Sequence, residues 1–535
     1  MDDHLLPAWL TCAGVTFNYL ESVGVSLSDF GGPPRTASLG GDRLGARLDF
    51  SNATASATDT ALERRRIMAA LVALQGRAGR VYATNPGRRL AGSFPTSELL
   101  SNPYWASGLT NWDSSGAEAV VSVADRRLRA TRAAGITARS IRNTQSFAVT
   151  AYAPYALRAL ALAGRGPLDY GLRLGTTSGA NDLYSLASAS AGLLTGVAVP
   201  PSTPVFFSLL DGATGRQAGD YQSFDYVSVS RCAVADCAPN LLIYSSDLSQ
   251  VDWTKNNASI ATTSVTLPDG TSGALHTIKE DATAAAGHRV NQAYTASSSA
   301  ADYCFAGAFK SANRSWVMLR MFEGTGSSTA EASFNLSAGT VGTVAGGANW
   351  SNARAFIVSL GDGWYYCAVV GSKTNAATAL EARINVGEAD ADITFNGGNQ
   401  DSIRVWNPTF AQSSLPVRLS ATTTTTNPTG VDQVGRRIYL RGLPASSAGL
   451  LYPGDEIEVF TSYGSEYKFV TDELRSDASG RGYLSISPPL RGPLTDGAAI
   501  IVNQPLGYWM PTEAPSFDHA PGILTNASID LQEAA

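Results

Sequence analysis

The chain has 535 residues, of which 44% are hydrophobic, so it is long enough to fold into several domains that each bury a core. Only 16% of the residues are charged and the formal net charge is −6, which argues against nucleic-acid binding because such binding needs a surplus of Lys and Arg. No run approaches about 18 consecutive apolar residues, so we expect no membrane span.

The N-terminal part contains the one helix that the sequence predicts clearly. Met1-Asp2-Asp3-His4 is acidic where a secretion signal would be basic, so we expect synthesis in the cytoplasm without a signal peptide. Thr60-Ala61-Leu62-Glu63 has the pattern of a capping box, and apolar residues follow at helical spacing from Ile67 to Leu74. Gly76 is placed to end this helix, and a strand is predicted from Val81 to Thr84.

The rest of the chain predicts a mainly β protein. The stretch from Ala148 to Leu162 is rich in Ala and Leu, but Pro154 interrupts it and its aromatic spacing favours strands. Short alternating runs bounded by turn residues continue toward the C-terminus: Trp316 to Phe322, Ala332 to Leu336, Trp364 to Val370, Ile438 to Arg441, Glu456 to Phe460, Tyr483 to Ile486 and Ala498 to Val502. Many short strands with frequent turns are typical of sandwiches and barrels.

Two similar segments divide the chain. Each opens with a pair of leucines, reaches a Trp at nearly the same spacing, and closes with Asp-x-aliphatic-x-Val. The first passes Trp112 and closes at Asp225, and the second passes Trp253 and closes at Asp401. They predict module 1 at residues 98–235 and module 2 at residues 238–421.

The two flanks are residues 1–97 and 427–535. The first flank has one helix and few convincing strands, whereas the second is nearly all short strands. The first flank has too few strands to close a β core alone, so two independent flanking domains are disfavoured. A sandwich with adjacent termini can also be inserted into a host loop at small entropic cost. The sequence therefore favours a split β-barrel or sandwich domain with one α-helix, carrying two inserted jelly-roll-like β-sandwiches. Two separate flanking domains remain the alternative.

Nothing in the sequence specifies a catalytic or metal centre. The four His are widely separated, no Cys/His cluster has metal-ligand spacing, and no Walker, dinucleotide or G-x-S-x-G motif occurs. Asp211, Asp225 and Glu331 are carboxylates that a glycoside hydrolase could use, but 45 acidic residues make such availability uninformative. Cys232 and Cys237 either pair locally or are buried thiols. We expect no enzyme, no metal and no cofactor.

Aromatic residues are the remaining candidates for a binding site. Trp112, Trp253, Trp316 and Trp364 lie in or beside strand patterns, and we expect them to mark the cores. Trp350 lies in the loop-like stretch Gly346-Gly347-Ala348-Asn349-Trp350-Ser351. An exposed indole can stack on a sugar ring, so Trp350 is the candidate contact for a glycan.

The order of motifs in module 2 resembles the carbohydrate-binding-module-like sandwich of bacteriophage tail proteins. The motifs that carry the resemblance are Asn240-Leu241-Leu242, Trp253-Thr254-Lys255, Leu267-Pro268-Asp269-Gly270-Thr271, Arg314-Ser315-Trp316-Val317, Phe334-Asn335-Leu336-Ser337-Ala338-Gly339 and Gly361-Asp362-Gly363-Trp364-Tyr365-Tyr366-Cys367. They cover about 180 residues, and module 1 resembles a more diverged jelly-roll of the same type.

The flanks resemble a distal-tail or baseplate protein of a long-tailed phage. That weaker resemblance rests on Arg66-Ile67-Met68-Ala69-Ala70-Leu71, Gly76-Arg77-Ala78-Gly79-Arg80-Val81-Tyr82, Gly449-Leu450-Leu451-Tyr452-Pro453-Gly454-Asp455, Ser476-Asp477-Ala478-Ser479-Gly480 and Pro488-Pro489-Leu490-Arg491. It implies a structural virion protein whose split assembly domain forms a ring, expected to be a hexamer, between the tail tube and the tail hub. The modules would then contact tail proteins or host-surface glycans. The first alternative is a trimeric receptor-binding tail fibre, and the second, which the sequence favours less, is a polysaccharide depolymerase.

Overall fold

The computed structural model describes residues 90–511, apart from 102, 104, 106, 108, 113–118, 125–126, 133–142, 167–168, 179, 212–216, 325–326, 424–432 and 462–463, together with flanking strands in residues 1–89 and 512–535. The described part is built of β-strands, as the sequence predicted. The predicted helix at residues 60–76 lies outside the described residues. Of the strands predicted from alternation, all seven C-terminal runs coincide with strands.

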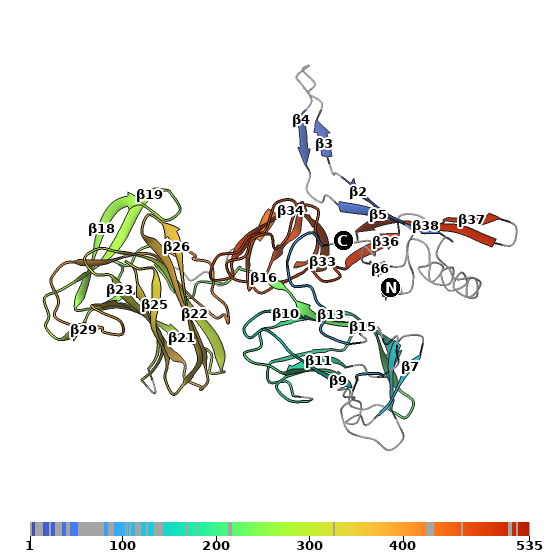
Figure 1. The fold of residues 1–535 in the computed structure, drawn as a ribbon, viewed down its shortest axis with the longest axis horizontal. Helices are drawn as coiled ribbons and strands as arrows, with labels where there is room; N and C mark the ends of the chain where they lie inside the picture. Colours follow the sequence, from blue (N-terminus) through green and yellow to red (C-terminus); the bar gives the residue numbers. More distant parts are fainter. Residues whose placement is uncertain are drawn as a thin grey trace.

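A seven-stranded sheet, here the terminal sheet, joins the two ends of the chain (Figure 1). Its strands in spatial order are β1 (Asp3–Leu5), β6 (Arg80–Ala83), β36 (Gly507–Pro511), β38 (Ile523–Glu533), β5 (Arg43–Ser51) and β2 (Gly14–Leu20), with β37 (Ser516–Ala520) paired to β38. The contacts between the ends are β6 with β36 and β5 with β38, both antiparallel. Strands from both flanks therefore share one sheet.

A two-stranded ribbon, β3 (Val23–Ser26) with β4 (Arg35–Ser38), stands away from the terminal sheet in Figure 1. These strands pair with each other and with no other described strand. A two-stranded ribbon is marginally stable alone in water. We therefore expect β3 and β4 to pack against another surface when the protein assembles.

Next to the terminal sheet lies a closed six-stranded barrel. Its strands in order are β16 (Ala233–Ala235), β31 (Gln433–Arg441), β34 (Gly482–Leu494), β33 (Gly464–Val470), β32 (Glu456–Thr461) and β35 (Ala499–Ile501). Phe94, which precedes module 1, is buried in the barrel core and its backbone N–H donates to Leu450 O at 2.9 Å. Residues 233–235, which the sequence places at the end of module 1, are a barrel strand instead. Three residues are too few for an alternation to be visible.

Module 1 is a sandwich of a five-stranded and a four-stranded sheet. The first has the order β13 (Gly192–Ala198), β10 (Tyr155–Arg165), β15 (Tyr221–Arg231), β8 (Arg127–Arg132) and β7 (Ala119–Ala124). The second has the order β12 (Tyr184–Ser188), β11 (Tyr170–Gly175), β14 (Val205–Asp211) and β9 (Asn143–Phe147). Trp105, Trp112, Tyr170, Phe207 and Phe224 fill the core between them.

Module 2 is a sandwich of two six-stranded sheets. The β23 sheet has the order β17 (Thr254–Asn256), β21 (Arg289–Thr295), β28 (Ala379–Gly387), β23 (Trp316–Glu323), β24 (Ser328–Asn335) and β25 (Thr340–Gly346). The β22 sheet has the order β18 (Ala258–Thr266), β19 (Ser272–Glu280), β30 (Asp401–Ala411), β22 (Ala301–Ser311), β27 (Trp364–Lys373) and β26 (Trp350–Gly361). A short pair, β20 (Ala286–Gly287) with β29 (Thr394–Phe395), lies beside them.

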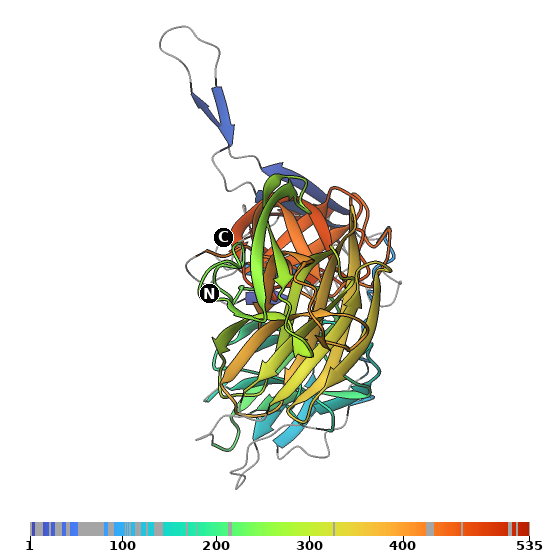
Figure 2. The ribbon, with the colours of Figure 1, turned by 90° about the vertical axis from the view of Figure 1, so that its left-hand side faces the viewer.

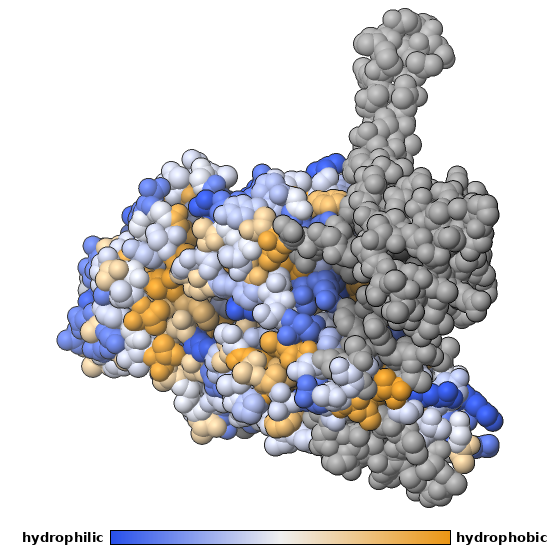
Figure 3. Space-filling model, turned by 45° about the vertical axis from the view of Figure 1, so that its right-hand side comes forward, coloured by the Kyte–Doolittle hydropathy of each residue, from blue (hydrophilic) through white to orange (hydrophobic). Residues whose placement is uncertain are grey.

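The barrel lies between module 2 and the terminal sheet, and module 1 lies against the barrel (Figure 1). Figure 2 views the molecule from the module 2 end, with that sandwich in front. In Figure 3 the described surface carries hydrophobic residues in small patches among hydrophilic ones. Large apolar side chains that are well exposed are few and scattered among the described residues, the most exposed being Val251 and Val434.

Candidate functional site

Two of the four tryptophans that the sequence marked, Trp112 and Trp253, lie in the sandwich cores. Trp364 is buried in a separate small cluster with Leu275 and Ala308, and Trp316, at the start of β23, is only half-buried. Trp253 donates from Nε1 to the backbone oxygen of Tyr244 at 3.0 Å, which fixes the ring in the module 2 core.

Trp350 is not the exposed loop residue that the sequence predicts. It begins β26, is 4% exposed, and packs edge-on against Tyr303 with the ring centroids 6.3 Å apart. Gly346 ends β25, and a turn follows in which Trp350 N donates to Gly347 O at 2.9 Å; this turn directs the indole inward. The Gly pair signalled a loop correctly, but the residue after a turn can enter the core.

The outer face of the β22 sheet is used to attach module 2. Its small and apolar side chains form one cluster with residues of the connecting segments: Ala238, Cys304, Ala306, Tyr366, Ala368, Val370, Ala411 and Val417. The Tyr366 hydroxyl donates to Val417 O at 2.8 Å, and the guanidinium of Arg481, from the barrel domain, lies 3.5 Å from the Tyr366 ring centroid. The part of this face that lies over β22, β27 and β30 is therefore covered.

The outer face of the β23 sheet presents polar side chains across neighbouring strands. Register pairs place Asn291, Arg383, Arg320 and Glu331 in one row across β21, β28, β23 and β24. Because side chains alternate across a strand, residues two positions away share this face. We call the set Asn291, Arg289, Glu381, Arg383, Arg320, Glu331 and Phe322 the arginine face.

Two of the three arginines on this face are paired with carboxylates. Arg320 Nε lies 2.6 Å from Glu331 Oε2, and Arg383 Nε lies 2.8 Å from Glu381 Oε2. Asn291 Nδ2 donates to the same Glu381 oxygen at 3.1 Å. The Arg383 guanidinium also lies over the ring of Phe322, 3.4 Å from its centroid. The row is thus a fixed array of donors on a half-buried surface.

Arg289 differs from its two neighbours. Its side chain makes no hydrogen bond and no ion pair with a described residue, and its Nε is buried without a partner. Burial lowers the pKa of Arg289 and the positive charge of Arg383 lowers it further, while the negative charge of Glu381 acts in the opposite direction. An arginine guanidinium remains charged at neutral pH. The sequence signal for this face is the alternation Trp316-x-Met318-x-Arg320-x-Phe322, which by itself predicts only a strand.

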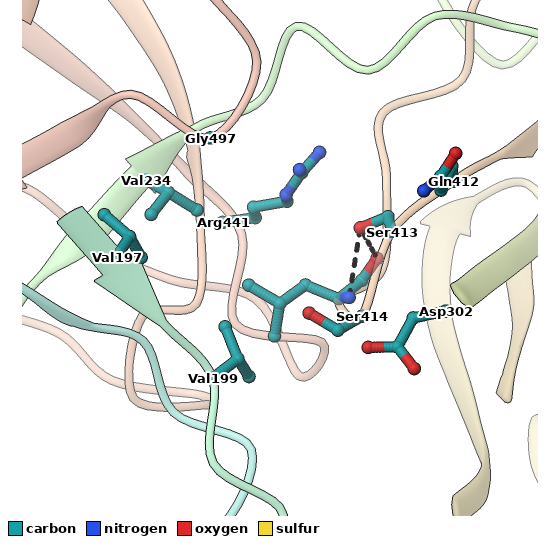
Figure 4. Close-up of a pocket in the computed structure, with 10 residues that line it drawn as sticks. Val197, Val199, Val234, Asp302, Gln412, Ser413, Ser414, Arg441 and Gly497 are labelled. Carbon is teal, nitrogen blue, oxygen red and sulfur yellow. Dashed lines mark hydrogen bonds between the residues drawn. The ribbon is translucent and has the colours of Figure 1, made fainter. Parts of the chain in front are cut away.

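A cavity of about 330 Å³ lies where module 1, the barrel and module 2 meet (Figure 4). Val197 and Val199 line it from module 1, Val234 and Arg441 from the barrel, and Ser413 and Ser414 from the end of module 2. Arg441 is bound by Asp236 at 2.9 Å and by Asp496 at 2.8 Å. The positive charge of Arg441 is therefore already compensated by two carboxylates. We interpret the cavity as a gap between packed domains and not as a ligand site.

The carboxylates that the sequence offered as candidates for glycoside hydrolysis lie on different strands. Glu331 pairs with Arg320, Asp225 lies within β15, and Asp211 ends β14. No group of three or more His, Cys, Asp or Glu residues in the described part could hold a metal ion. Cys232 and Cys237 are both free and buried, which settles the alternative that the sequence left open. Within the described residues, no helix is long and apolar enough to cross a membrane.

Comparisons with known proteins give the following. No family model and no curated protein matches this chain. Among solved structures, a carbohydrate-binding module of the CBM4 type is 14% identical and covers 24% of this chain and 98% of its own, with a TM-score of 0.21. The CBM22-1–CBM22-2 tandem of Paenibacillus barcinonensis Xyn10C is 12% identical and covers 60% of this chain and 98% of its own, also with a TM-score of 0.21. The sandwich assignment of both modules rests on their own strand pairing.

Proposed function

We propose that this chain is a structural virion protein of a phage distal tail or baseplate, in which a split assembly domain carries two peripheral sandwiches. The assembly domain would comprise the terminal sheet and the barrel and would form a ring between tail tube and tail hub. The proposal joins the motif resemblance of the flanks to one structural observation, the pairing of the two chain ends in the terminal sheet.

That pairing makes both modules insertions into one host. The chain leaves the barrel at Phe94 to build module 1 and returns at β16. It leaves again for module 2 and returns at Gln433, whose side-chain Nε2 donates to Asp236 O at 3.0 Å. Entry and exit of each insertion therefore lie on one small barrel, which leaves the sandwiches free to project.

The test is the mass of the assembled protein. Light scattering of the full chain, combined with symmetry in electron micrographs, is expected to give a six-fold ring. The two-stranded ribbon β3–β4 would find its missing partner surface on a neighbouring copy. A stable trimer, as a receptor-binding fibre would form, or a monomer at all concentrations contradicts the proposal.

A second function, glycan binding by module 2, is favoured by the arginine face. It combines hydrogen-bond donors and acceptors on neighbouring strands with an aromatic ring, and these are the groups that recognise sugars. The full chain passed over an array of neutral and charged host-surface glycans is expected to bind at least one of them. Binding that survives replacement of Arg320, Arg383 and Phe322 by Ala would locate it elsewhere.

A further inference from the structure

We propose that the arginine face selects acidic saccharides, those carrying carboxylate or phosphate groups. This inference deepens the proposed glycan binding and rests on it. Its starting point is Arg289, the arginine on this face whose side chain makes no hydrogen bond or ion pair with a described residue, and whose nearest opposite charge, Glu381, is already bound by Arg383.

The charges on the face do not balance. Arg289, Arg320 and Arg383 face two carboxylates, Glu331 and Glu381, and both carboxylates already accept a bond from an arginine. A further carboxylate, Asp390, lies at the far edge of the sheet, where it accepts bonds from Thr343 N at 2.8 Å and Thr343 Oγ1 at 3.0 Å. One positive charge therefore remains on a chain whose formal net charge is −6.

The arrangement of the arginines opposes stability. Arg320 and Arg383 are direct cross-strand partners, and Arg289 is one diagonal step from Arg383 on the next strand. Like charges directly opposite one another destabilise a sheet. A half-buried guanidinium without a partner also gives up hydration that nothing in the described part replaces. An anion bound over this row would offset both costs.

The chemistry of guanidinium narrows the ligand. Its planar set of N–H donors matches the two oxygens of a carboxylate or phosphate, which a neutral hydroxyl cannot reproduce. Phe322 lies in the same patch, and the stacking of the Arg383 guanidinium on its ring holds that donor group in place. The centre of the opposite face of module 2 is covered by its attachment to the barrel, whereas the outer face of the β23 sheet has no such cover among the described residues.

The experiment measures equilibrium binding of the full chain to three polymers: polygalacturonate, its fully methyl-esterified form, and a phosphomannan. The ester has the same backbone without the charge. We expect binding to at least one acidic polymer, and at least roughly tenfold weaker binding to the ester, because a hydrogen bond to a charged group is lost. The carboxylate and phosphate arms identify which anion is preferred.

Arg289→Gln tests the residue, and Arg404→Gln, on β30 of the opposite sheet, is the matched control with the same loss of charge. R289Q should weaken acidic binding about tenfold or more while R404Q leaves it unchanged. The Arg289 side chain makes no hydrogen bond or ion pair with a described residue, so R289Q should fold, and its thermal midpoint verifies that. Equal binding of acid and ester overturns the selectivity but leaves glycan binding standing. No binding to either acidic polymer, or equal effects of both variants, overturns the inference outright.

Discussion

At the scale of single residues, the burial of a tryptophan in the structure predicts its contribution to stability better than its neighbours in the sequence do. Trp350 packs within the module 2 core, whereas Trp316 is half-buried on the outer face of the β23 sheet. Replacing a buried Trp by Ala usually costs about 3–5 kcal/mol, because the transfer free energy is lost and a cavity remains. We expect Trp350→Ala to lower the unfolding free energy of module 2 by about that amount.

Denaturant unfolding followed by Trp fluorescence measures this effect, with Trp316→Ala as the companion variant. The half-buried Trp316 should cost clearly less, since part of its surface already contacts water. Equal losses for the two variants would show that the burial of Trp350 does not govern its contribution.

The thiols provide a second residue-scale prediction. Burial raises the pKa of Cys232 to about 12 and that of Cys237 to about 11, and it also raises the pKa values of Cys304 and Cys367. Because the thiolate is the reactive form, these four thiols should not react with a disulfide reagent at pH 8 until the protein unfolds. Titration of the native chain should therefore find at most Cys12, and two or more rapidly reacting thiols would contradict this.

At the scale of elements, the repeated sequence pattern has a direct cause in strand pairing. Leu99 N donates to Val229 O at 2.9 Å, and Leu241 N donates to Phe410 O at 2.7 Å. The opening leucines of each module thus pair with its closing strand, β15 or β30. The sequence could reveal both modules because each joins its opening leucines to its closing strand, although the acceptor is the Val of the closing motif in module 1 and lies further along the strand, at Phe410, in module 2.

Other elements left no such trace. The barrel strand β16 is three buried residues long, and its partners Leu440 and Arg441 are about 200 residues away in sequence. The arginine face was equally hidden, because Arg320 and Arg383 become neighbours only when β23 and β28 pair. Local alternation predicts that a strand exists but cannot tell which strand lies beside it.

The barrel contains a buried ion pair that predicts a pH dependence. Lys468 Nζ lies 2.8 Å from Glu466 Oε2, with both side chains fully buried. Burial alone would raise the pKa of Glu466, but Lys468 and the hydrogen bond from Thr461 hold it below its ordinary value of 4.5. The stability that this carboxylate contributes is therefore present above pH 4.5 and is lost as the pH falls through the lower, folded-state pKa.

Thermal midpoints measured from pH 7 down to pH 3 test this, with Glu466→Gln and Glu458→Gln as paired variants. E466Q should be less stable at neutral pH, because Lys468 loses its partner, and should lose less stability on acidification. Burial raises the pKa of Glu458 despite Arg158, so its contribution has the opposite sign and E458Q should keep the acid loss. Similar acid profiles for the two variants would contradict the assignment.

At the scale of the whole molecule, the two modules are attached differently. Module 1 is fixed to the barrel by apolar clusters and, in addition, by a buried charge: Arg158 donates to Glu458 Oε2 at 2.8 Å and to Asn503 O at 3.0 Å. Module 2 is held mainly by the apolar cluster on its β22 sheet and by Arg481 over Tyr366. Removing one partner of a buried charge pair is strongly destabilising, because it leaves an uncompensated charge in the interior. Removing module 2 leaves no such uncompensated charge, because its attachment is mainly apolar.

Module 2 should therefore be removable. The chain enters and leaves it at Asp236 and Gln433, which are hydrogen-bonded to each other, so a short Gly-Ser linker can replace residues 240–423. Asp236 and Arg441 keep their mutual ion pair in that variant. We expect it to fold and to give the same number of subunits per particle as the full chain, measured by light scattering, because the assembly contacts are proposed to lie in the terminal sheet and barrel. A folded variant that remains monomeric while the full chain assembles would place the subunit contacts in module 2 instead, and would transfer the assembly role from the host domain to the inserted sandwich.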